Sequence, residues 1–192
     1  VLNGLTLNGT LTMHRWGYYD QTFLSFPDTQ TLAGTGAVVF AQSGARANGN
    51  YSNFVRPTDD GTMTIGAGIT VRGQEGYVGD PALPLVNRGR IVSDSGWTIF
   101  VRGTAWVNEG TLAASNGTLE TSGTWTSPGT VETTGGTVTL GGTWSSSGAI
   151  TGSGGTLSFN GAWQVTGTVD LANTTLNLGG TFHWSDLGTL TY

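Results

Sequence analysis

A strict 19-residue repeat in the second half of the chain is the feature that most constrains its fold. Six columns of residues keep this interval in phase: one is aromatic, two are Gly, one is Thr and two are aliphatic. The aromatic column consists of Trp106, Trp125, Trp144, Trp163 and Phe182. A repeat held over four units indicates an architecture in which each unit packs mainly on its two neighbours.

Each unit of the repeat contains three short alternating segments. Residues 123–141 read GTWTSPGTVETTGGTVTLG, with apolar and polar residues alternating in three runs that Gly-Thr opens. Such short alternation predicts strands, and Gly between strands predicts tight corners. A propeller blade needs about 40 residues, which excludes that alternative. We therefore predict an all-β fold, a parallel β-helix (β-solenoid) of about eight coils with three strands per coil.

The columns predict the direction of each side chain. Aliphatic residues such as Leu119, Val138 and Leu157 should stack inside the solenoid, while the Thr that precede them should face outward. For the Trp column we favour an inward stack that fills a corner, over the alternative of an exposed stripe.

The first half of the chain repeats less regularly. Segment 85–91 matches 106–112, and 68–73 matches 97–103; further strands are predicted at 5–13, 31–40 and 61–65. The stretches between these strands are predicted to be loops inserted on one face; they span roughly 14–30, 41–60 and 74–84. The chain is predicted to be one domain over 1–192, with irregular coils at 1–103 and regular coils at 104–192.

Charge is scarce and unevenly distributed. Charged residues make up 10% of the chain and the net charge is −5. All seven basic residues are Arg at or before Arg102, where acidic residues balance them, so the net negative charge falls on the regular half. No basic footprint for nucleic acid is present. The absence of Cys excludes disulfides, and no apolar run is long enough to predict a membrane span or a signal peptide.

Several segments of the chain resemble the sequences of a known class of repeat proteins. They are LTLNGTLTM, QTLAGTGAVVF, RPTDDGTMTIGAGITVRG and LVNRGRIVSDSGWTIFVRGTAWVNEGTL, followed by coils with GTW and GGTL. They resemble the repetitive β-solenoid regions of large secreted bacterial surface proteins, such as autotransporter passengers and adhesins of planctomycetes and cyanobacteria. The resemblance implies an extracellular stalk, adhesin segment or fibre. Its expected partners are neighbouring coils of a longer chain or other copies stacked end to end.

Residues for catalysis are sparse. Asp59 and Asp60 are adjacent in PTDDGT and are more typical of a turn than of a catalytic carboxylate pair. The two imidazoles, His14 and His183, have no Cys partners, and a metal site needs three or four convergent ligands. We expect no enzymatic activity, no cofactor and no metal.

Aromatic residues in the inserted stretches suggest a binding surface. They are Trp16, Tyr18, Tyr19, Tyr51 and Tyr77. With hydrogen bonds from Arg15, Arg46 or Arg56, they could line a groove for glycans, although the favoured interpretation is that they cover the solenoid. The expected function is therefore structural or adhesive, and the alternative is a carbohydrate-binding or polysaccharide-processing module.

Four sequons mark candidate glycosylation sites. They are at Asn8, Asn50, Asn116 and Asn173. In a chain this rich in Gly and Thr some of them arise by chance.

Overall fold

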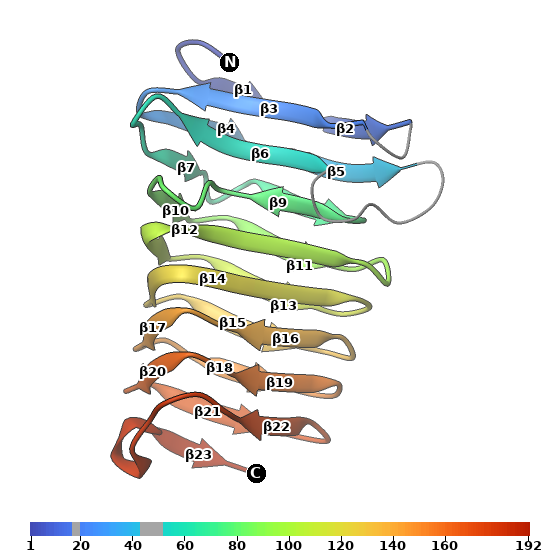
Figure 1. Cartoon of the computed structure of the whole chain (residues 1–192). Coiled ribbons are helices and arrows are strands. Elements are labelled where there is room, and N and C mark those ends of the chain that lie inside the picture. Colours follow the sequence, from blue (N-terminus) through green and yellow to red (C-terminus); the bar gives the residue numbers. More distant parts are fainter. Residues whose placement is uncertain (17–19, 43–51) are drawn as a thin grey trace.

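The computed structural model describes residues 1–16, 20–42 and 52–192, and it shows a β-solenoid (Figure 1). All strand pairs are parallel, and each coil contributes one strand segment to each of three faces. The first coil consists of β1 (Leu5–Leu7), β2 (Thr10–Arg15) and β3 (Thr22–Pro27), and a late coil consists of β20 (Ala162–Val165), β21 (Thr168–Leu171) and β22 (Thr175–Leu178). Strand β23 (Thr189–Thr191) continues the next coil. The prediction of an all-β parallel solenoid with three strands per coil is confirmed.

The first face, called the β2 face, is a nine-stranded sheet. Its strands are β2 (Thr10–Arg15), β5 (Ala37–Gln42), β8 (Thr70–Gly73), β11 (Arg90–Ser93), β13 (Thr111–Ala114), β15 (Thr130–Thr133), β18 (Ile150–Gly152), β21 (Thr168–Leu171) and β23 (Thr189–Thr191). The chain crosses this face once per coil.

The other two faces belong to one 14-stranded sheet, because β12 (Thr98–Asn108) and β14 (Thr118–Ser127) run round the corner between them. The β3 face holds the first halves of β12 and β14 together with β3 (Thr22–Pro27), β6 (Asn53–Thr58), β9 (Gly76–Val78), β16 (Thr137–Leu140), β19 (Thr156–Phe159) and β22 (Thr175–Leu178). The β1 face holds their second halves together with β1 (Leu5–Leu7), β4 (Gln30–Gly34), β7 (Met63–Ile65), β10 (Leu85–Asn87), β17 (Thr143–Ser146) and β20 (Ala162–Val165).

The structure corrects the prediction of inserted loops. The stretches 14–30, 41–60 and 74–84 each contain a strand of the β3 face, namely β3, β6 and β9. The match between 68–73 and 97–103 is also wrong, because β8 lies in the β2 face and β12 begins in the β3 face. The match between 85–91 and 106–112 is confirmed by pairing of Val86 with Val107.

The Trp column lies inside a corner, as predicted. Trp106, Trp125, Trp144 and Trp163 are 0–4% exposed, and their rings stack at centroid distances of 4.7, 5.2 and 5.9 Å. Each indole Nε1 donates a hydrogen bond to a backbone carbonyl 16 residues later, at 2.8–3.0 Å. The column therefore buries apolar area without leaving its polar atom unpaired.

A Gly column allows neighbouring coils to approach at one corner. Gly123 has φ +90°, and a Cβ there would collide with the carbonyl oxygen of Gly103 in the preceding coil. Gly142, Gly161 and Gly180 repeat this geometry against the Gly one coil earlier. Gly is required at these positions both by the backbone angle and by the close approach.

A short polar ladder interrupts the apolar interior. Asn87, Asn108, Ser127 and Ser146 are 0–1% exposed. Asn87 Nδ2 donates to Asn108 Oδ1 at 2.7 Å, and Asn108 Nδ2 donates to Ser127 Oγ at 3.0 Å. These bonds link successive coils and fix their register.

Candidate functional site

A second aromatic stack lies on the outer side of the β3 face. Val55, Val78 and Val101 of this face are fully buried and point into the core, so the residues that precede them point outward. The outward residues form a stack in register, which we call the ring ladder: Phe23, Phe54, Tyr77 and Phe100. Centroid distances are 5.0, 5.1 and 4.7 Å, and the rings lie within 20° of parallel.

Two arginines lie against the ring ladder. Arg56 Cζ is 4.6 Å from the Phe23 centroid, and Arg102 Cζ is 4.3 Å from the Tyr77 centroid. The Cζ atoms of Arg56 and Arg102 also lie 6.0 and 5.8 Å from the centroid of the Phe54 ring. These distances place each guanidinium in cation–π contact.

Neither of these arginines has a carboxylate partner among the described residues, where the ion pairs involve other arginines. The undescribed segments 17–19 and 43–51 contain no acidic residue. The Nε atoms of Arg56 and Arg102 are buried and make no hydrogen bond. The pair is thus held by aromatic rings rather than by anions.

The surroundings of the ladder perturb two titratable groups. Burial raises the pKa of Tyr77, and the nearby carboxylate of Glu75 acts in the same direction. Burial also lowers the pKa of Arg102, and repulsion from Arg56 adds to this, while Tyr77 and Asp80 oppose it. Two like charges therefore lie close enough to influence each other in a partly dehydrated setting.

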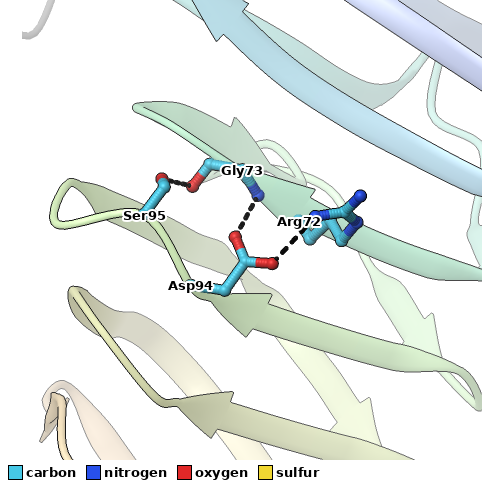
Figure 2. A network of polar contacts seen from close by, with 4 residues as sticks. All are labelled: Arg72, Gly73, Asp94 and Ser95. Atoms are coloured by element: carbon cyan, nitrogen blue, oxygen red, sulfur yellow. Dashed lines mark hydrogen bonds and ion pairs between the residues drawn. The ribbon is translucent and has the colours of Figure 1, made fainter.

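Three arginines elsewhere have structural ion pairs. Arg72 Nη1 lies 3.1 Å from Asp94 Oδ2, and Asp94 Oδ1 accepts a hydrogen bond from the Gly73 backbone N–H at 3.1 Å. Figure 2 shows this network, with Ser95 donating to the Gly73 carbonyl. The other two ion pairs join the two halves of the chain: Arg88 with Glu109, and Arg90 with Glu132.

The predicted aromatic groove is not formed by the residues that can be located. Tyr77 is 8% exposed, and Phe54 and Phe100 cover the two faces of its ring, so no face is free for a sugar. Trp16 is 75% exposed and lies against His14 at the end of β2, two coils away from β9. Tyr18, Tyr19, Tyr51 and Arg46 lie outside the described residues.

Of the predicted arginines, Arg56 belongs to the ladder, whereas Arg15 is 1% exposed and bonds to Gln42. Sequence reasoning missed Arg102 and the alignment of the rings. A signal for both was present: Phe54-Val55-Arg56 and Phe100-Val101-Arg102 share one pattern, with Tyr77-Val78-Gly79 between them.

The remaining candidate residues are at exposed turns. Asp59 and Asp60 have φ +56° and +59°, which confirms the predicted turn. Among the predicted sequons, Asn8, Asn116 and Asn173 are exposed, and Asn50 is outside the described residues. In the described part of the chain, no group of three or more His, Asp or Glu is placed to hold a metal ion. The described residues also include no helix that is long and apolar enough to cross a membrane.

The two ends of the solenoid present incompletely buried apolar residues. At the first coil these are Leu5, Leu7, Leu11 and Leu24. At the last coils they are Leu176, Leu178, Phe182 and Leu187. Strands β1, β2 and β3 each pair on one side only within the described structure, and so do β22 and β23.

Comparison with protein-family models, with curated proteins and with solved structures finds no match to this chain.

Proposed function

We propose that the chain is a non-enzymatic structural solenoid of an extracellular surface protein, acting as a stalk, an adhesin segment or a fibre subunit. The main observation behind this proposal is that, among the described residues, both ends of the solenoid have unpaired strand edges and incompletely buried apolar residues. The first coil presents strand edges on all three faces and the last coils on the β2 and β3 faces, and both ends carry apolar residues that a further coil would bury. Unpaired parallel edges favour addition of another coil.

The additional coil is either part of a longer chain or the end of another copy. In the second case, β2 of one copy would follow β23 of its neighbour in the β2 face. Leu190 of β23, which is 36% exposed, would then be covered by Leu11 of β2. This contact uses the same pairing that joins coils inside the molecule.

Electron microscopy of negatively stained protein, with mass photometry over a range of concentrations, tests self-assembly. We expect head-to-tail oligomers or filaments. Leu190→Arg should abolish them, because it places a charge on the stacking surface, whereas Thr139→Arg on the side of the solenoid should not. Monomers of the unaltered chain at all concentrations would contradict self-assembly.

A second candidate function is carbohydrate binding on the β3 face. It is favoured by the ring ladder and its two arginines, since arginine without an anionic partner is suited to bind one. A glycan array tests this function with the unaltered chain. Binding to no glycan would leave the structural role alone.

A further inference from the structure

We propose that Arg56 and Arg102 form a site for a linear acidic polysaccharide, which runs along the solenoid axis over the β3 face. This inference rests on the carbohydrate-binding alternative of the proposed function. It names the class of ligand as a polymer whose sugars carry carboxylates.

The charge of the site favours an anionic ligand. Arg56 and Arg102 carry like charges on either side of Phe54, and no carboxylate of the described residues pairs with them. The three arginines in ion pairs show how this chain neutralises a guanidinium where no ligand is needed. A guanidinium binds a carboxylate through two parallel N–H donors, so each arginine is suited to one acidic group.

The spacing of the two arginines favours a linear polymer along the axis. Arg56 is on β6 and Arg102 is on β12, and only β9 lies between them. Since parallel strands are about 4.8 Å apart, the two backbone positions are about 10 Å apart along the axis. A polyuronate carries a carboxylate on every sugar at a step comparable to one coil, so two of its acidic groups can reach the two arginines.

The rest of the face favours a polysaccharide over an acidic peptide. Beyond Phe100, the outward column continues with Glu120, and then with the uncharged polar residues Thr139, Ser158 and Asn177. Hydroxyl and amide groups can bond to sugar hydroxyls. An arginine cluster can also bind an acidic peptide, but an extended peptide obtains its main-chain hydrogen bonds from an open sheet edge. The arginine pair instead lies in the middle of a sheet, between paired strands.

Glu120 sets one limit of the site. Its register partner is Phe100, the last ring of the ladder, and its exposed carboxylate would repel an acidic polymer. The anionic groups are therefore expected over the ladder itself. Removal of this charge in Glu120→Gln should tighten binding.

Isothermal titration calorimetry with polygalacturonate tests the site. The unaltered chain should bind, with an affinity that falls as salt is added. Arg56→Gln and Arg102→Gln should each weaken binding about tenfold or more, because each removes a charge-assisted contact. Arg102→Lys, which keeps the charge without the planar fork, should bind more weakly than the unaltered chain but better than Arg102→Gln. Arg88→Gln, an exposed arginine elsewhere, is the matched control and should bind normally.

Three results would overturn the proposal: no binding of polygalacturonate, equal weakening by Arg88→Gln, or equally tight binding of poly-glutamate. The fully methyl-esterified polymer, which keeps the sugar backbone without its charge, should not bind. Far-UV circular dichroism of each variant checks that the solenoid is intact. Self-assembly is measured separately, so a chain that stacks end to end but does not bind polygalacturonate refutes this site without refuting the structural role.

Discussion

Replacement of Trp125 by Ala is the most direct test of the inner Trp column. The ring is 1% exposed and lies between Trp106 and Trp144, at 4.7 and 5.2 Å. Its Nε1 donates to the Gly141 carbonyl at 3.0 Å. Truncation of a buried Trp to Ala costs about 3–5 kcal/mol of unfolding free energy.

Trp125→Phe separates the ring from its hydrogen bond. Phe preserves most of the stacking but leaves the Gly141 carbonyl without this donor, at a cost of about 1–3 kcal/mol. For a chain of this size, 1 kcal/mol corresponds to roughly 2–4 °C, so Trp125→Ala should lower the melting temperature by roughly 6–20 °C. Trp125→Phe should lower it by roughly 2–12 °C, which is less than the effect of Trp125→Ala.

Differential scanning calorimetry and urea denaturation measure these changes. The control is Trp184→Ala, because Trp184 is 77% exposed and its loss should change stability by no more than about 0.5 kcal/mol. The reasoning is refuted if Trp125→Ala costs no more than Trp184→Ala. Equal destabilisation by Trp125→Phe and Trp125→Ala would refute the claim that stacking outweighs the hydrogen bond.

Two further predictions concern the corner and the ring ladder. Gly123→Ala should destabilise the chain by at least about 2 kcal/mol more than Gly96→Ala. Both glycines have positive φ, but only Gly123 faces the backbone of another coil. Equal melting temperatures of the two variants would contradict this expectation. Since burial raises the pKa of Tyr77, its contribution to stability is complete below about pH 10 and is lost as the pH rises through the folded-state pKa. Between about pH 9 and pH 12, the melting temperature should therefore fall less in Tyr77→Phe than in the unaltered chain. If the two proteins lose melting temperature equally over this pH range, the buried Tyr77 hydroxyl does not contribute in this way.

The regular half was predictable because a constant interval fixes the register. When every coil has 19 residues, the position of Trp125 in one coil determines that of Trp144 in the next, and strand pairing follows this alignment. Alternation within each segment then determines which side chains are buried. Burial of Val131 and Ile150 at 0% exposure follows from these two periods alone.

The first half was less predictable because its coils differ in length. Leu5 pairs with Leu32 after 27 residues, whereas Gln30 pairs with Met63 after 33. Without a constant interval, the strands of the β3 face could not be aligned from sequence and were predicted to be loops. The candidate site depends on that alignment, since Phe23, Phe54 and Tyr77 come together only through pairing of β3, β6 and β9.

Aromatic stacking continues along most of the solenoid but changes from the outside to the inside. The outer ladder ends at Phe100 and the inner column begins at Trp106, and both residues lie on β12. The inner Trp side chains are buried in the core, and their indole N–H groups donate to backbone carbonyls. The inner column therefore stabilises the fold without needing a partner from outside the molecule. In the outer ladder, Phe23 is 45% exposed and two arginines without anionic partners lie against the rings. The cation–π contacts stabilise both guanidinium groups, but neither group has an ion-pair partner among the described residues, and this difference between the two stacks favours a ligand on the β3 face.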